Sequence, residues 1–255
     1  MELTITKRDG TKELFNADRI NRSIERACWG LLDPIAKVTQ VATDTKVILY
    51  DGITTEELDV ATINAAVQNI KDDPDYDKIA TRLLLKTVYR HVLGEYDSDF
   101  EKLKILHRES FPNYIKKGVA NKILDERMEK NFDLQKLANT LDIERDELFI
   151  YAGLSSLLDR YSVKDKNQRP SETPQYFFMR VAMGLSYNEK DPTEWAIKFY
   201  EKMSSHEYIA GGSTNINSGN PNPALSNCFL LEIHDDIKHI SKSVADVMLL
   251  SKASG

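Results

Sequence analysis

Apolar and polar residues alternate with a strand-like period at the start of the chain and with a helix-like period over most of the rest. The alternation from Leu3 meets an Asp9-Gly10 turn and resumes up to Phe15, which predicts a β-hairpin. Apolar positions then recur every three to four residues, and polar caps and glycines divide them into helices. We expect four helices here, at about residues 17–29, at about residues 34–49, from Thr54 or Thr55 onward, and at about residues 76–93.

The pattern stays helical beyond Ser98 and changes near the end. Helices are expected over residues 99–110, 118–127, 144–158, 175–185 and 192–204, and residues 161–170 form a polar connection or hairpin. The run 174–180 is interpreted as ordinary core packing of an amphipathic helix. Residues 228–233 then predict a buried strand, and residues 237–250 a helix. One strand and one helix make no sheet, so the sequence is expected to stop inside a domain.

Composition and charge narrow the functional classes. The chain has 255 residues, 41% hydrophobic residues and a formal net charge of −6, which argues against a general nucleic-acid binder and a polybasic membrane-surface protein. The amino terminus lacks the pattern of a signal peptide, and no apolar run has the length of a membrane span. The two cysteines form no disulfide framework, and the five histidines show no metal-ligand spacing. A cytoplasmic protein without a metal of its own is expected, with Cys28 buried as a packing residue.

Cations gather around the predicted hairpin and the helix start that follows it. Lys7 and Arg8 precede the turn, and Arg19 follows the N-cap candidate Asn16. Arg and Lys neutralise phosphates, and a helix N-terminus adds backbone N–H donors. The pattern therefore predicts a nucleotide site, although a solvated hairpin with ordinary surface charges fits the same spacing.

A second group of polar residues lies just before the predicted final strand. Residues 212–219 combine glycines, hydroxyls and amides, and Cys228 opens the strand. Such a loop offers donors to a phosphate, and a cysteine at the mouth of a strand stands where α/β proteins often place reacting groups. The alternative is a Gly/Asn turn that leads into a buried strand whose cysteine only packs.

The first 95 residues resemble the ATP cone, a regulatory module found at the start of many ribonucleotide reductase large subunits. The Lys7–Gly10 hairpin, the four helices and the run Tyr50–Thr55 carry the resemblance. It implies that ATP or dATP is held by Lys7, Arg8, Glu13, Asn16, Arg19, Thr55 and Arg90. Asp59 departs from members that often carry histidine there, and since an acidic group repels phosphate, we expect weak nucleotide binding or an absence of dATP inhibition.

The segment from Gly212 onward resembles the start of the catalytic barrel in the same large subunit. By this resemblance Cys228 is one half of the redox dithiol, Thr214, Ser226 and Asn227 bind substrate, and Asp235 belongs to the site for the deoxynucleotide specificity effector. Asp235 also fits a plain helix N-cap. The second redox cysteine and the radical-bearing cysteine of the family are absent from these 255 residues, so the segment alone is expected to be inactive.

The resemblance implies a mainly α fold in three parts. These are an α+β ATP cone over residues 1–95, a helical domain over 96–208, and over 209–255 the first strand and helix of a ten-stranded α/β barrel. The complete class I enzyme would reduce ribonucleoside diphosphates, with a radical from a metal cofactor in a small (β) subunit and electrons from thioredoxin or glutaredoxin. The implied partners are the C-terminal remainder of the large subunit, that small subunit and a second copy of the completed large subunit. Two alternatives stay open: a non-enzymatic ATP-sensing module, and a cobalamin-dependent or anaerobic relative.

Overall fold

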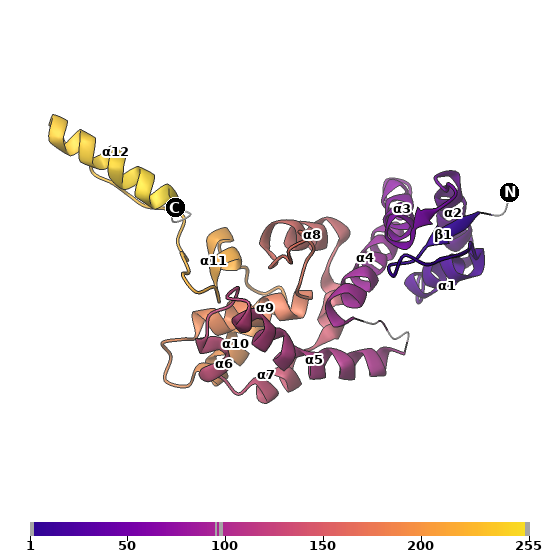
Figure 1. The fold of residues 1–255 in the computed structure, drawn as a ribbon, viewed down its shortest axis with the longest axis horizontal. Coiled ribbons are helices and arrows are strands. Elements are labelled where there is room, and N and C mark those ends of the chain that lie inside the picture. Colours follow the sequence, from indigo (N-terminus) through magenta and orange to yellow (C-terminus); the bar gives the residue numbers. More distant parts are fainter. Residues whose placement is uncertain (1–2, 95, 97–98, 253–255) are drawn as a thin grey trace. The chain divides into compact units, whose positions relative to one another are not determined.

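The structure is a computed structural model that describes residues 3–94, 96 and 99–252, and its contacts divide the chain into two compact units (Figure 1). Unit 1 comprises Met1–Tyr96 and Phe149–Ser156, and unit 2 comprises Asp97–Leu148 and Leu157–Gly255. The predicted boundary at residues 95 and 96 and the predicted end of the chain lie partly outside the described residues. The three-part division at residues 95 and 208 stays a prediction.

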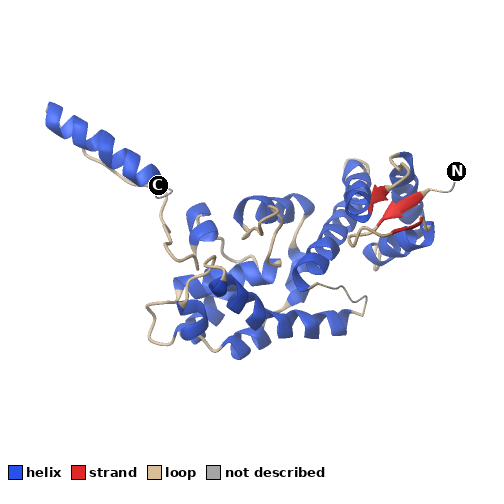
Figure 2. Cartoon of the chain, in the orientation of Figure 1, coloured by secondary structure: helices blue, strands red, loops and turns tan. Residues whose placement is uncertain are grey.

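The predicted hairpin is confirmed, and a third strand joins it. β1 (Thr4–Thr6) pairs antiparallel with β2 (Lys12–Leu14), and β3 (Ile53–Thr54) adds in parallel to give the order β2-β1-β3. Figure 2 shows these strands together among helices. Gly10 adopts φ +82°, the conformation that the Asp-Gly turn requires. β3 was not predicted, because two residues carry no period and their strand partners, Ile5 for Ile53 and Thr6 for Thr54, lie far away in the sequence.

Four helices enclose this sheet and form the core of unit 1. They are α1 (Ala17–Ala27), α2 (Pro34–Val47), α3 (Thr55–Gln68) and α4 (Asp75–Leu93). The predicted caps are confirmed: Asn16 Oδ1 accepts from the Asp18 amide, and Thr54 and Glu57 form a capping box. Cys28 is fully buried beside Ile24 and Ile79, as expected for a packing residue. α8 (Tyr151–Ser156) also packs against this core through Tyr151.

Unit 2 is helical in its described residues, although several predicted bounds were wrong. The helix expected to end at residue 110 continues as α5 (Phe100–Ala120), because Phe111 and Ile115 are buried on both sides of Pro112. The helix expected over residues 118–127 is instead a turn, in which Lys122 has φ +58° and the amides of Ile123 and Leu124 both donate to Gly118 O. α6 (Arg127–Lys130) and α7 (Leu134–Thr140) follow this turn.

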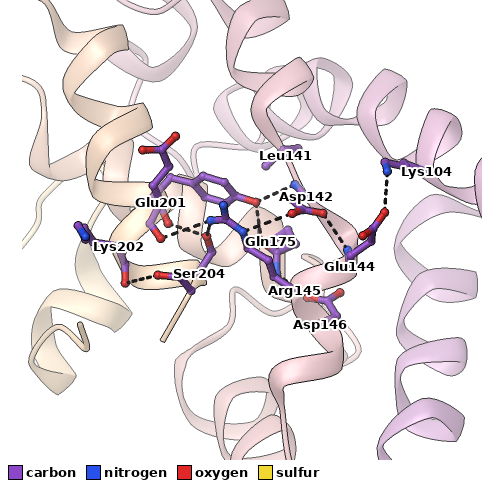
Figure 3. A network of polar contacts seen from close by, with 12 residues as sticks. Lys104, Leu141, Asp142, Glu144, Arg145, Asp146, Gln175, Glu201, Lys202 and Ser204 are labelled. Atoms are coloured by element: carbon purple, nitrogen blue, oxygen red, sulfur yellow. Dashed lines mark hydrogen bonds and ion pairs between the residues drawn. The ribbon is translucent and has the colours of Figure 1, made fainter. Parts of the chain in front are cut away.

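The helix expected over residues 144–158 is broken into three pieces. A 3-10 helix, η1 (Ile143–Leu148), precedes α8, and a π-helix, η2 (Leu157–Tyr161), follows it. Asp146 on η1 is buried and accepts from Gln175 Nε2 at 2.6 Å, and Arg145 donates to Glu201 O at 3.3 Å (Figure 3). These bonds fix η1 to the helices that follow, so side-chain partners rather than the apolar period set the break.

Two successive helices of unit 2 agree with the sequence pattern. α9 (Pro174–Leu185) and α10 (Pro192–Ser204) begin at N-caps Thr173 and Asp191. Ten residues of α9, from Pro174 to Met183, are buried. α9 is therefore surrounded by protein on nearly every side, which is typical of a central core helix.

The end of the chain differs from the prediction. Residues 212–219 do not form an open loop, because Gly212–Asn217 is a short helix, α11. The described residues show no strand over 228–233: the segment lacks regular structure, and Leu230 is fully exposed. A strand requires backbone partners, and the described part of the chain supplies none there. The predicted helix is confirmed as α12 (Ile237–Lys252). No described helix is long and apolar enough to cross a membrane.

Candidate functional site

A pocket of about 250 Å³ in unit 1 brings together five of the seven predicted nucleotide-binding residues. It is bounded by the sheet, α1, α3 and α4. Apolar side chains line part of it, among them Ile5, Phe15, Leu58 and Leu83. The polar lining includes the five predicted residues Glu13, Asn16, Arg19, Thr55 and Arg90, together with Ser23, Asp59, Thr62 and Lys86.

Lys7 and Arg8, the other two predicted residues, do not line this pocket and are engaged in ion pairs. Lys7 Nζ lies 2.6 Å from Glu13 Oε2, and Arg8 Nε lies 3.5 Å from Glu56 Oε1. Arg19 also donates to Glu13. The hydrogen bond from Lys7, together with the charge of Arg19, holds the pKa of Glu13 below its ordinary value. Glu13 therefore acts as an anionic bridge that holds Lys7 and Arg19 beside the β2 strand.

Opposite this bridge, α4 presents two cations that share one carboxylate. Arg90 Nη1 lies 3.0 Å from Asp59 Oδ2, and Lys86 Nζ lies 3.5 Å from Asp59 Oδ1. Lys86 also donates to Ser23 Oγ at 2.6 Å. Burial lowers the pKa of Lys86, which marks it as a cation with incomplete solvation. Asp59 thus neutralises two basic groups inside the pocket.

Lys86 was missed by the sequence analysis, although a signal for it was present. It precedes Arg90 by four residues on the same helix, a spacing that places both side chains on one face. Since Arg90 was already a candidate, its i−4 neighbour was the first position to inspect. Thr55 reaches the pocket because it is the first residue of α3, directly after the N-cap Thr54.

The second candidate group lies in unit 2, around α11. Thr214 Oγ1 donates to Leu225 O at 2.9 Å, and Asn217 Nδ2 donates to Ala224 O at 2.8 Å. The short helix therefore holds the two residues that precede Ser226. Thr214 is expected to contact substrate, and its bond to the Leu225 carbonyl was not predicted. Its hydroxyl oxygen still has acceptor capacity in this arrangement.

The predicted substrate-binding and redox residues at the end of this segment are exposed. Ser226, Asn227 and Cys228 all face solvent, and Cys228 Sγ lies 3.5 Å from Asn227 Oδ1. Cys28, the only other cysteine in the sequence, is buried in the core of unit 1, where burial raises its pKa to about 11. Cys28 is therefore a core thiol and not a partner for thiol exchange.

The remaining predicted position, Asp235, is exposed just before α12. Its neighbour Asp236 provides the helix cap, since Asp236 Oδ2 accepts from the amide of His239 at 3.1 Å. Among the residues that the structure describes, no group of three or more His, Cys, Asp or Glu side chains is arranged to hold a metal ion.

Two family models match the chain. Residues 3–91 match the ATP cone domain, and residues 147–223 match the ribonucleotide reductase, all-alpha domain. The first match spans the sheet, the four helices and the pocket. The second spans α9, α10 and α11. The pocket and Thr214 therefore lie inside recognised domains, whereas Ser226, Asn227, Cys228 and Asp235 lie beyond residue 223.

Curated relatives match nearly the whole chain. It is 37% identical over 253 residues to the ribonucleoside-diphosphate reductase subunit alpha of Chlamydia muridarum, covering 98% of this chain and 24% of that protein. It is 35% identical over 256 residues to the alpha subunit of Helicobacter pylori strain 26695, covering 99% and 31%. The large subunit of Caenorhabditis elegans is 32% identical over 259 residues, covering 98% and 31%.

The chain thus spans about a quarter to a third of the length of the curated relatives it matches. The chain carries an ATP cone and the ribonucleotide reductase all-alpha domain, and it corresponds to the N-terminal region of the large (alpha) subunits of that enzyme family.

Proposed function

We propose that this chain is the nucleotide-sensing N-terminal part of a ribonucleoside-diphosphate reductase large subunit. The observation that carries the proposal is the pocket of unit 1, in which Arg19, Lys86 and Arg90 surround a partly apolar cavity inside a recognised ATP cone. A purine packs against apolar side chains, whereas a triphosphate needs several cations and N–H donors. The pocket offers both.

In this proposal the residues of α4 hold the phosphates. Lys86 and Arg90 now share the Asp59 carboxylate, so an incoming phosphate competes with Asp59 for the same two cations. Thr55 is the first residue of α3, where the positive end of the helix dipole favours an anion. Arg19 is held near the pocket by Glu13. ATP, dATP or both are the effectors that this arrangement fits.

The proposal predicts that ATP stabilises unit 1 against unfolding. A ligand that binds only the folded state at about 100 times its Kd adds about 2.7 kcal/mol. Trp29 of unit 1 is 79% exposed in the folded chain and reports little, so urea unfolding of unit 1 is followed by pulsed hydrogen exchange with mass spectrometry of peptides from α3 and α4. The midpoint is expected to rise with ATP concentration. An unchanged midpoint at millimolar ATP would contradict the nucleotide role.

The catalytic part of the proposal concerns Cys228. Phe229, Ile233 and the α12 residues Val244 and Leu249 are exposed apolar side chains in the described structure, which fits a first barrel strand and helix that further strands cover. In the complete enzyme Cys228 and a second thiol would reduce the ribose. The two sulfurs form a disulfide and lose two electrons, the 2′-hydroxyl leaves as water, and thioredoxin or glutaredoxin restores the dithiol.

The rest of the proposed enzyme lies outside this chain. A metal cofactor in a small (β) subunit would supply the radical, the remainder of the large subunit would supply the other catalytic cysteines, and two large subunits would form a dimer. Thr214, Ser226 and Asn227 would contact the nucleotide substrate, and Asp235 the deoxynucleotide effector.

A purely regulatory module is the second candidate, because the pocket is formed by residues of unit 1 alone. The two functions differ at Cys228. In the complete large subunit with its small subunit, Cys228→Ser should abolish turnover supported by thioredoxin if the chain is part of the enzyme. Unchanged turnover would favour the regulatory module. Thr39→Ser, on the exposed surface of α2, is a control that should retain full activity.

A further inference from the structure

A fully buried ion pair lies beneath the glycine-rich segment of unit 2. Arg180 on α9 and Glu172 both have no exposed side-chain surface. Arg180 Nε donates to Glu172 Oε2 at 2.9 Å, and Nη2 donates to Oε1 at 3.0 Å, so the contact is bidentate. A buried pair is costly to desolvate and adds little net stability compared with apolar side chains of the same size. Net stability alone therefore does not explain this ion pair, and its remaining contacts indicate another role.

The other donors of Arg180 identify that role. Nη1 donates to Ser218 O at 2.6 Å, and Nη2 donates to Asn215 O at 3.1 Å. Both carbonyls lie at the C-terminal end of α11, where a helix leaves its last carbonyls without intrahelical partners. Nη2 also lies 3.3 Å from Tyr161 O. The planar guanidinium thus connects the Glu172 carboxylate to the last turn of α11, which a compact ammonium group cannot do in the same way.

Glu172 is fixed from its other side, so the pair cannot shift easily. Tyr114 donates to Glu172 Oε2 at 2.5 Å, and the amide of Val163 donates to Oε1 at 2.8 Å. Although burial disfavours the charged form of the guanidinium, the Glu172 carboxylate outweighs it and raises the pKa of Arg180. Arg180 is therefore a cation whose N–H groups donate to defined oxygens, while its guanidinium lies over the ring of Phe177.

The effect of this pair reaches the residues before Cys228. α11 is bound to α9 by Arg180 and by Ser218 Oγ, which donates to Val181 O at 2.9 Å. From α11, Thr214 and Asn217 hold the carbonyls of Leu225 and Ala224. Hydrogen bonds thus link α9 to α11 and α11 to Ala224 and Leu225. The last residue of this series, Leu225, directly precedes Ser226.

We propose that Arg180, fixed by Glu172, is a positioning residue that clamps α11 and thereby sets where Thr214 and the Ser226–Cys228 stretch stand. Its importance for ribose reduction rests on the function proposed above, whereas the clamp itself is a property of this chain. The clamp holds the segment in place without touching substrate.

The clamp is tested on this chain by hydrogen exchange with mass spectrometry. Arg180→Lys keeps the charge beside Glu172 but cannot serve both carboxylate oxygens and both carbonyls. Amides of residues 212–225 should exchange faster, while those of α10 keep the wild-type rate. Arg145→Lys, which changes another guanidinium of unit 2 bound to Glu201 O, should leave residues 212–225 unchanged. Equal exchange of 212–225 in Arg180→Lys and wild type would overturn the clamp, and so would faster exchange throughout unit 2.

A second variant tests the clamp even if Arg180→Lys prevents unit 2 from folding. In the double variant Glu172→Gln with Arg180→Met, no charge is left buried without a partner, and Met fills a similar volume. We expect unit 2 to fold and residues 212–225 to lose protection again. Wild-type protection of these residues in the folded double variant would overturn the proposal.

The consequence for catalysis is tested in the complete large subunit with its small subunit. Displacement of a substrate-binding segment by about 1 Å can cost roughly a hundredfold, so Arg180→Lys should lower kcat/KM by roughly tenfold to a hundredfold, with part of the change in KM. If Arg180→Lys retains kcat/KM while Cys228→Ser abolishes it, the catalytic consequence is refuted and the enzyme function stands. If Cys228→Ser is active while Arg180→Lys still loosens residues 212–225, the enzyme function fails and the clamp stands.

Discussion

Gly184→Ala tests the close packing of α9 against the segment that carries the candidate substrate residues. A Cβ built at Gly184 would clash with Gly219 N and Ser218 Oγ and would lie 2.9 Å from Ser218 C. Two of these three contacts are backbone atoms, which cannot rotate away. The chain at residues 218–219 must therefore withdraw from α9, and the bond from Ser218 Oγ to Val181 O must lengthen or break.

The magnitude follows from three contributions. Overpacking of a well-packed contact costs about 1–3 kcal/mol, and a lost hydrogen bond costs about 1 kcal/mol. Alanine in a helix offsets about 1 kcal/mol relative to glycine. We therefore expect unit 2 to lose about 1–3 kcal/mol of its free energy of unfolding. Faster hydrogen exchange at residues 212–225 should accompany the loss.

The assay is urea unfolding followed by the fluorescence of Trp195 in a Trp29→Phe background, which reports on unit 2. Gly212→Ala is the matched control, because the nearest atom to its added Cβ is Tyr161 Cε1 at 3.8 Å, an ordinary contact. The control should unfold at the wild-type midpoint or slightly above it. A Gly184→Ala protein as stable as wild type would refute the tight contact that the structure shows.

Three further predictions concern charges. Asp59→Asn should tighten ATP binding by roughly tenfold, about 1.4 kcal/mol, because Lys86 and Arg90 no longer share their charge with a carboxylate; a weaker affinity by calorimetry would count against the proposed phosphate site. With Asp59 present, turnover of the complete enzyme should survive a dATP titration, and clean shut-off at low dATP would reject this expectation. Burial lowers the pKa of His107 from 6.5 to about 3. As pH falls, His107 is protonated in the unfolded chain before it is protonated in the folded chain. The contribution of neutral His107 to the free energy of unfolding is therefore fully present above pH 6.5 and is lost as pH falls toward 3. His107→Asn should flatten the dependence of the urea midpoint on pH between 6.5 and 4, and an unchanged slope would assign it to other groups.

Local signals predicted unit 1 well. The Asp-Gly turn, the Asn16 cap and the Thr54–Glu57 capping box all act within a few residues, so the sequence alone located the hairpin and the helix starts. β3 was not predicted, because its pairing with β1 depends on residues that lie far apart in the sequence. The same limit applies to the segment 228–233, where an apolar pattern predicted a strand but the described residues provide no neighbouring strand.

The functional residues show the same division. Five of the seven cone residues meet in one pocket: Asn16, Arg19 and Thr55 lie at helix starts, Glu13 lies on β2 and Arg90 lies on α4. Arg180 was interpreted as core packing, because the apolar pattern around it, Phe177 to Met183, is that of a buried helix. Only the fold shows that Glu172 and the carbonyls of α11 surround it. Buried polar networks depend on partners far apart in sequence, and a period cannot reveal them.

The central claim is that the pocket of unit 1 binds a nucleoside triphosphate through Lys86 and Arg90, and calorimetric titration of the chain with ATP tests it most directly. Loss of one charged phosphate contact costs about 1.5–3 kcal/mol, or roughly tenfold to 150-fold in affinity. One ATP should bind per chain, Lys86→Ala and Arg90→Ala should each weaken it by that factor, and Lys46→Ala, an exposed lysine on α2 outside the pocket, should not. Equal affinity in all four proteins, or no binding by wild type, would contradict the account.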